Sequence, residues 1–179
     1  MKNRIFGITI AALGLLIGGW TMAAMANSGD DGNDTNIATL DNCDPTDPAW
    51  GPTGGCMLKP KEGDVKFAEF AAFLFTPLAP PGTLIGHPSW RMQPSYLSID
   101  EKTIRVRNGG GRTHTFTKVA NFGGGFVPQL SGTLIEAPEC MASPPTLAPG
   151  QTAQLNLAPG VYKFQCCIHP WMRATIRIE

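Results

Sequence analysis

The C-terminal end of the chain places a cysteine, a histidine and a methionine on one short loop. Cys166, His169 and Met172 follow one another at intervals of three residues. The runs on either side, residues 161–165 and 174–178, alternate apolar with polar side chains, which is typical of half-buried strands. A thiolate, an imidazole and a thioether together form a soft donor set that suits copper better than other common metal ions. The pattern therefore predicts a metal-binding loop held by a strand at each end.

A trigonal copper site needs a second imidazole beside the thiolate, and His114 is the best candidate among the three histidines. It opens a third strand-like run, residues 114–119, just after the turn sequence Asn108-Gly-Gly-Gly. Two imidazoles, a thiolate and a weak axial thioether make a geometry that both oxidation states of copper accept. We predict one type 1 copper ion per chain, bound by His114, Cys166 and His169, with Met172 as the axial ligand.

Simpler interpretations of these residues exist. Cys166 could belong to a structural disulfide, His169 could be an ordinary surface histidine, and Met172 could fill a gap in the core. The joint spacing favours copper over all three. A zinc site that also includes Cys167 is disfavoured, because adjacent residues of a strand point to opposite faces and rarely reach one ion.

The C-terminal region resembles the cupredoxins, the small blue copper proteins of the plastocyanin and amicyanin type. The order of the amicyanin ligand loop is matched at Cys166, His169, Pro170, Trp171, Met172 and Arg173, and Tyr162 also fits the family pattern. The resemblance covers residues 88–179 and implies an all-β Greek-key sandwich that carries single electrons. It departs from the family at Thr115, where asparagine is usual, and at Cys167, where the family has no cysteine. We expect Thr115 to donate a hydrogen bond to the backbone of the ligand loop in place of the asparagine.

Residues 1–26 have the features of a secretory signal peptide. Lys2 and Arg4 precede an apolar stretch, and Ala24-Met25-Ala26 is a small-x-small cleavage site. We expect an exported protein, periplasmic or extracellular, without stable membrane insertion after cleavage. An uncleaved membrane anchor is the alternative.

Five cysteines in an exported chain imply disulfides with one thiol left over. If Cys166 binds copper, Cys43 and Cys56 form the nearest remaining pair, and Cys140 is left for Cys167. Alternation along the strand should turn Cys167 away from the metal as Cys166 turns toward it.

The region before residue 88 is predicted to have two parts. Residues 27–42 are polar and acidic and are expected to form a flexible linker. Residues 43–87 are predicted to be an N-terminal extension with a disulfide-closed loop and a short helix, in which Phe67, Phe70, Phe73 and Leu74 recur at helical spacing after the N-cap candidate Asp64. The aromatic face of this helix should pack on the barrel, with a partner-docking surface as the alternative. We expect His87 to be a turn residue before the first strand of the barrel, with a supporting role at the copper, or a role as an alternative copper ligand, as the other possibility.

From residue 88 onward the pattern predicts strands, at 96–99, 103–107, 114–119, 151–157, 161–165 and 174–178. Their alternation predicts two antiparallel sheets packed face to face. In the long connection at 121–147 we expect irregular strands at most, and the pattern does not place them.

These features favour an exported one-electron carrier, expected to be a monomer, over an enzyme. Reduction of nitrite or oxygen needs further copper ions with further histidines, and only His87 remains. Copper storage or delivery is the alternative, but Met57, Met92, Met141 and Met172 are scattered rather than clustered. The resemblance implies that redox partners dock briefly near His169 and Trp171, through an exposed edge of the imidazole. Balanced charge, with 14 basic and 14 acidic residues, argues against a nucleic-acid partner.

Overall fold

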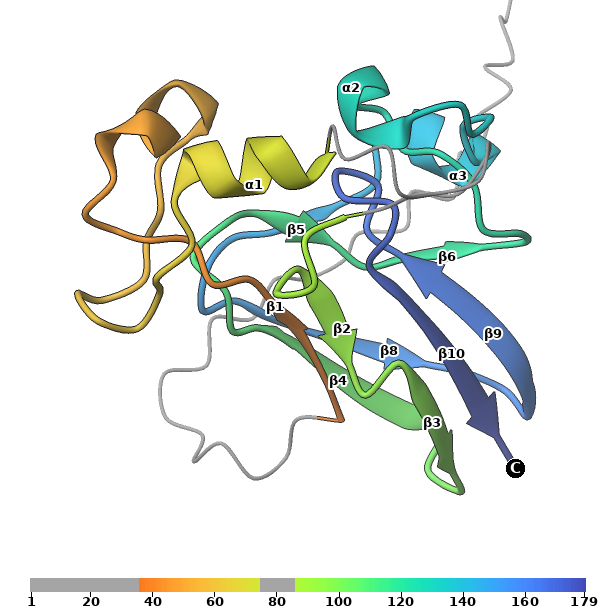
Figure 1. Cartoon of the computed structure of the whole chain (residues 1–179). Coiled ribbons are helices and arrows are strands. Elements are labelled where there is room, and N and C mark those ends of the chain that lie inside the picture. The colour runs from red at the N-terminus through yellow and green to blue at the C-terminus, as the bar shows by residue number, and fades with distance from the viewer. Residues whose placement is uncertain (1–35, 75–85) are drawn as a thin grey trace, which may run out of the picture.

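The computed structural model describes residues 36–74 and 86–179, so the predicted signal peptide and most of the predicted linker lie outside the described residues. Two four-stranded sheets form a β-sandwich (Figure 1). The first has the strand order β2-β1-β4-β8, the second has the order β3-β10-β9-β6, and β5 pairs with β7 in a small separate sheet. The strands are β1 (Ile37–Leu40), β2 (Arg91–Gln93), β3 (Tyr96–Ile99), β4 (Thr103–Asn108), β5 (His114–Thr115), β6 (Thr117–Val119), β7 (Thr146–Leu147), β8 (Thr152–Asn156), β9 (Gly160–Gln165) and β10 (Arg173–Ile178).

The all-β sandwich expected from the alternating runs is confirmed. Ile104 and Val106 of the first sheet and Ile176 of the second are all fully buried and belong to one hydrophobic core. Phe116 and Phe164 stack between the sheets, with ring centroids 4.3 Å apart. The sheets are mixed rather than wholly antiparallel, since β1 runs parallel to β4 and β3 runs parallel to β10. This follows because the chain crosses between the sheets, so that neighbouring strands are often not consecutive in sequence.

The prediction of a flexible linker is wrong for residues 37–42. Strand β1 lies between β2 and β4 in the first sheet, and the side chains of Ile37 and Thr39 are at most 1 % exposed. Pairing on both sides satisfies the backbone polar groups of this short segment. The sandwich therefore begins before residue 88, where the domain with the candidate ligands was predicted to start.

The N-terminal extension contains the predicted disulfide and helix, and both pack on the sandwich. Cys43 is bonded to Cys56, and a 3₁₀ helix, η1 (Pro48–Thr53), lies in the loop between them. Helix α1 (Phe67–Leu74) follows, and the buried ring of Trp50 contacts Phe67, Phe70 and Trp90 at centroid distances of 5.1–5.7 Å. The aromatic face of α1 is thus directed at the barrel, as expected.

The start of α1 differs from the sequence prediction. The carboxylate of Asp47, rather than that of Asp64, accepts a hydrogen bond from the backbone N–H of Phe67 at 2.8 Å. Asp64 instead accepts from the side chain of Asn42. A cap supplied from a distant segment is invisible to a pattern that considers only neighbouring residues.

The connection at 121–147 contains two short helices as well as strand β7 at its end and an isolated bridge between Gly124 and Glu136. The helices are α2 (Pro128–Ser131) and α3 (Pro138–Met141), and a proline stands at the start of each. Proline suits this position because its ring fixes φ at a helical value and its missing N–H has no helical partner there. In residues 36–74 and 86–179, no helix is both long and apolar enough to cross a membrane.

Candidate metal centre

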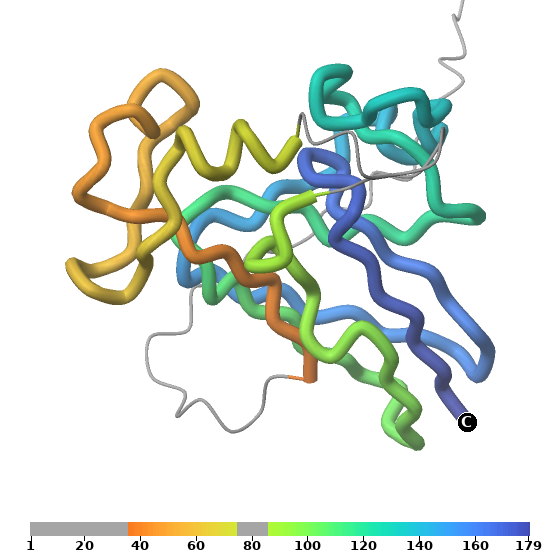
Figure 2. The backbone as a smooth tube through the Cα atoms, in the orientation of Figure 1, coloured from red at the N-terminus to blue at the C-terminus, as the bar shows by residue number. Residues whose placement is uncertain are grey.

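Three of the four predicted ligands meet at one end of the sandwich. His114 opens β5, Cys166 follows β9, and His169 lies in the loop that leads to β10. Their donor atoms all lie within 4.8 Å of one another, and none of the three residues is more than 4 % exposed. Figure 2 shows this loop at the same end of the molecule as α1.

The separations in this cluster fit a trigonal metal site. The Cys166 Sγ lies 3.9 Å from Nδ1 of His114 and 3.7 Å from Nδ1 of His169. An ion about 2.0–2.1 Å from nitrogen and about 2.3 Å from sulfur, the bond lengths seen for zinc, would hold such atoms roughly 3.8 Å apart in a trigonal plane. The donor set of one thiolate and two imidazoles suits copper.

Backbone hydrogen bonds hold the sulfur and close the loop around it. The N–H groups of Thr115 and His169 donate to Cys166 Sγ, at 3.3 and 3.4 Å. Cys166 N–H donates to the carbonyl of Met172, and Met172 N–H donates to that of His169. Met172 is fully buried next to this turn. Its role as an axial ligand stays a prediction.

The charges of the three side chains favour a thiolate. Burial alone would raise the pKa of Cys166, but hydrogen bonds and electrostatic interactions with His114 and His169 hold it well below the usual thiol value. Burial alone would lower the pKa of His114, yet hydrogen bonds and negative charge from Asp41 and Cys166 raise it to about 9. Burial lowers the pKa of His169. A thiolate is the form of cysteine that binds metals.

Thr115 contacts the ligand loop as a hydrogen-bond acceptor, whereas the sequence analysis expected it to be a donor. Its hydroxyl oxygen accepts a hydrogen bond from the backbone N–H of Cys167 at 2.7 Å. Thr117 donates its own hydroxyl to Thr115 at 3.1 Å. The threonine therefore joins β5 to the ligand loop as an acceptor.

The two adjacent cysteines separate as predicted. Cys167 forms a disulfide with Cys140 of α3, and Cys166 is the free cysteine. The disulfide removes Cys167 from the metal cluster, which rules out the zinc site that needed both sulfurs. It also ties the connection at 121–147 to the base of the ligand loop.

His169 is less accessible than the sequence analysis expected. It is 4 % exposed, and the ring of Phe70 from α1 lies edge-on to it at a centroid distance of 6.5 Å. Phe70 also contacts Trp171, at 6.2 Å. The expectation of an exposed imidazole edge is therefore wrong, because the N-terminal extension places a helix over this loop.

His87 lies outside the cluster and acts as the expected turn residue. Its carbonyl accepts from Trp90 N–H, and its ring nitrogen Nδ1 accepts from Ser89 N–H. Nε2 faces the carboxylate of Glu69 in α1 at 3.3 Å. His87 thus anchors α1 to the turn before β2.

Sequence reasoning missed Asp41. Its carboxylate lies 2.8 Å from Nε2 of His114, and both side chains are fully buried. The run Ile37-Ala-Thr39-Leu just before Asp41 is less polar than the residues that precede it, but it does not alternate, so it gives no clear strand signal.

Comparisons with known proteins give a limited likeness. No family model matches the chain, and no curated protein matches it in sequence. A purple cupredoxin from Nitrosopumilus maritimus is similar in structure, with 20 % identity and a TM-score of 0.37, over 52 % of this chain and 86 % of that one. An amicyanin from Paracoccus versutus shows 17 % identity and a TM-score of 0.32, over 50 % of this chain and 73 % of the other. Identities and TM-scores this low do not support a functional assignment, which depends instead on the geometry of the site.

Proposed function

We propose that the chain is an exported type 1 copper protein that carries single electrons between redox partners. The observation that supports this most directly is the buried cluster of one cysteine sulfur and two histidine Nδ1 atoms at separations suited to a trigonal ion. His114, Cys166 and His169 would be the strong ligands, with Met172 as the axial one. Bound copper would supply the one-electron couple.

The surroundings of the cluster suit a carrier, because they resist rearrangement. The ligand loop is anchored by β9 and β10, closed by backbone hydrogen bonds, joined to β5 through Thr115, and tied to α3 by the Cys140–Cys167 disulfide. Donor atoms held in this way keep similar positions when the charge of a bound ion changes. Both disulfides, Cys43–Cys56 and Cys140–Cys167, also support an oxidising, exported location.

Copper storage or delivery is less well supported. A protein that hands over its metal needs accessible, exchangeable donors, whereas the three candidate ligands are at most 4 % exposed. Met57 and Met141 are exposed, but Met92 and Met172 are buried, so the methionines do not form one accessible cluster. We also favour a carrier over an enzyme, with the chain acting as a monomer.

Copper titration of the mature wild-type protein tests the proposed function. We expect binding to saturate at one ion per chain and to produce intense visible absorption from sulfur-to-copper charge transfer. Zinc should bind at the same residues without colour, which provides the control. Saturation without a visible band, or a band that needs two ions per chain, would contradict a type 1 site.

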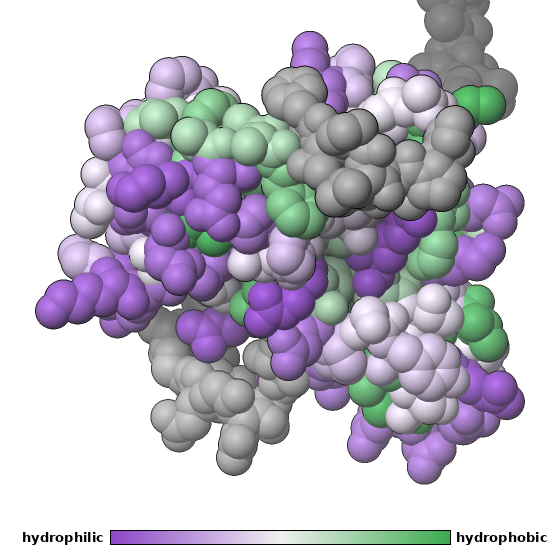
Figure 3. All heavy atoms as spheres, in the orientation of Figure 1, coloured by the Kyte–Doolittle hydropathy of each residue, from purple (hydrophilic) through white to green (hydrophobic). Residues whose placement is uncertain are grey.

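Redox partners are proposed to dock on the face formed by Trp171 and α1. Trp171 is partly exposed beside the ligand loop, and apolar side chains reach the surface over α1 (Figure 3). Because His169 itself is covered, the contact would be made through these neighbours. A small, partly apolar patch suits the brief encounters of redox proteins.

Electron self-exchange between two copies of the protein provides a test that needs no identified partner. A Trp171→Gln variant should bind copper normally but exchange electrons about tenfold more slowly, since an aromatic anchor at an interface contributes ~1–2 kcal/mol. Val161→Gln is the matched control, because Val161 is 62 % exposed at the opposite end of β9. Equal rates in both variants, measured by NMR line broadening, would show that Trp171 is not part of the docking face.

A further inference from the structure

Asp41 reaches the candidate metal centre from a segment far away in sequence. It directly follows β1, and its Oδ2 lies 2.8 Å from Nε2 of His114. Both side chains are completely buried, so water does not screen their interaction. Nδ1 of the same ring faces Cys166. The carboxylate and the proposed metal site therefore lie on opposite sides of one imidazole.

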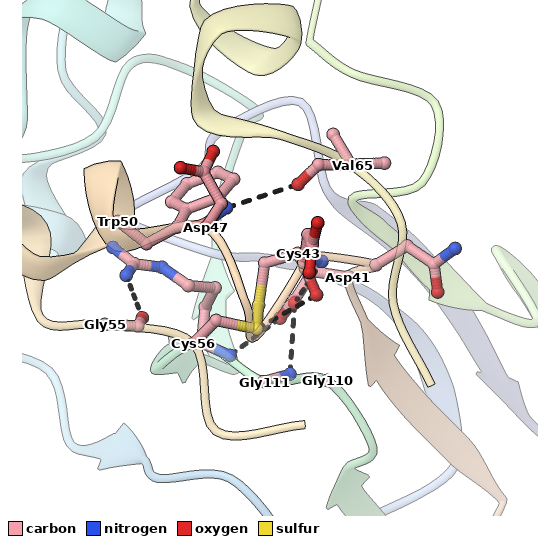
Figure 4. The surroundings of a disulfide bond; sticks show 12 residues. Asp41, Cys43, Asp47, Trp50, Gly55, Cys56, Val65, Gly110 and Gly111 are labelled. Atoms are coloured by element: carbon pink, nitrogen blue, oxygen red, sulfur yellow. Dashed lines mark hydrogen bonds between the residues drawn. A yellow bond between two sulfur atoms is a disulfide. The ribbon is translucent and has the colours of Figure 1, made fainter. Parts of the chain in front are cut away.

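The backbone of the glycine triplet holds this carboxylate in place. Oδ1 of Asp41 accepts from Gly111 N–H at 3.0 Å, and Oδ2 accepts from Arg112 N–H at 2.9 Å (Figure 4). A Cβ on Gly110 would overlap Asp41 Oδ2, and one on Gly111 would lie 2.7 Å from the sulfur of Cys43. The triplet thus permits a close approach of the N-terminal segment, in addition to making a turn.

The side chain of Arg112 is directed away from Asp41. Its guanidinium donates to the carbonyl oxygens of Gly55 and Thr53 and lies over the ring of Trp50, 5.0 Å from its centroid. Among the described residues, His114 is the basic side chain in ion-pair contact with Asp41. The negative charge of Asp41 therefore acts on His114 in direct contact and on the guanidinium of Arg112 without direct contact.

We infer that Asp41 is a positioning residue of the metal centre, which makes strand β1 and the Cys43–Cys56 loop part of that centre. This inference rests on the proposed function. By accepting a hydrogen bond from Nε2–H, the carboxylate selects the tautomer whose Nδ1 lone pair faces Cys166 and fixes the plane of the ring. Its charge also favours the more highly charged oxidation state of a copper ion on the far side of the imidazole.

An Asp41→Asn variant separates the charge from the shape of the side chain. We expect the equilibrium between Cu(II) and Cu(I) to shift about tenfold toward Cu(I), which corresponds to ~59 mV for one electron. The wavelength of the visible band should also change, because His114, which Asp41 contacts, would bind the same copper ion as the sulfur of Cys166. Asp44→Asn is the matched control: Asp44 carries the same charge in the same segment but contacts Thr46 and Lys66 instead of a candidate ligand. Equal potentials in the two variants would overturn the inference.

A measurement on the wild-type protein covers the case in which Asp41→Asn does not fold. In the zinc-loaded form, nitrogen-15 NMR should show that Nε2 of His114 carries a slowly exchanging proton and that Nδ1 carries none. The reverse tautomer, or a rapidly exchanging Nε2 proton, would refute the role of Asp41. Because this readout needs no copper, it stands even if the copper titration fails, and the two hypotheses are tested separately.

Discussion

A Cys166→Ser variant is expected to lose the visible absorption of the copper-loaded protein completely, whereas Cys167→Ser keeps it. The reason is geometric: Cys166 Sγ lies within 4 Å of both candidate histidine nitrogens, while the sulfur of Cys167 is bonded to that of Cys140. A serine hydroxyl at position 166 cannot supply the sulfur-to-copper transition. Absorption spectra at equal copper loading provide the measurement.

The control is Cys140→Ser, which breaks the same disulfide without touching the ligand loop. Cys140→Ser and Cys167→Ser should both retain colour and should lose similar stability, roughly 3–4 kcal/mol from the chain-entropy model for a loop of this length. Denaturant unfolding compares the two directly. If Cys167→Ser bleached the protein as fully as Cys166→Ser, the assignment of the ligand cysteine would be wrong.

Replacing Phe164 by alanine should lower the free energy of unfolding by ~3–5 kcal/mol, the usual cost of deleting a buried aromatic side chain. Phe164 is 0 % exposed on β9 and stacks on Phe116, so its removal leaves a cavity between the two sheets. Val161→Ala on the same strand is the control, because Val161 is 62 % exposed and should change stability only slightly. Similar unfolding midpoints for the two variants would contradict the position of β9 in the core.

The second half of the fold could be predicted from sequence because its strands alternate clearly. Residues 96–99 form β3, as expected, and the predicted strands at 103–107, 161–165 and 174–178 differ from β4, β9 and β10 by one residue at an end. The run at 114–119 divides into β5 and β6, which pair with different strands. Such a change of partner leaves no trace in the alternation of side chains.

The part of the candidate site whose residues lie close together in the sequence could be predicted. Cys166 and His169 lie on one loop, and the separation of Cys166 from Cys167, predicted from the two-residue period of a strand, is found even though β9 ends at Gln165. Asp41 and Phe70 could not be found in this way, because each contacts the site from another segment. Long-range contacts of this kind depend on the tertiary structure, and they decide both the hydrogen bonding of His114 and the covering of His169.

The opposite orientation of Cys166 and Cys167 bears on how the protein matures. In the folded chain, the side chain next to Cys140 is that of Cys167, while Cys166 faces the two imidazoles. Oxidation after folding therefore yields the correct bond and spares the one thiol that the metal needs. A chain oxidised before its strands have formed lacks this discrimination, and a bond from Cys140 to Cys166 would remove the metal site. Folding before oxidation thus favours the Cys140–Cys167 bond and leaves the thiol of Cys166 free for a metal.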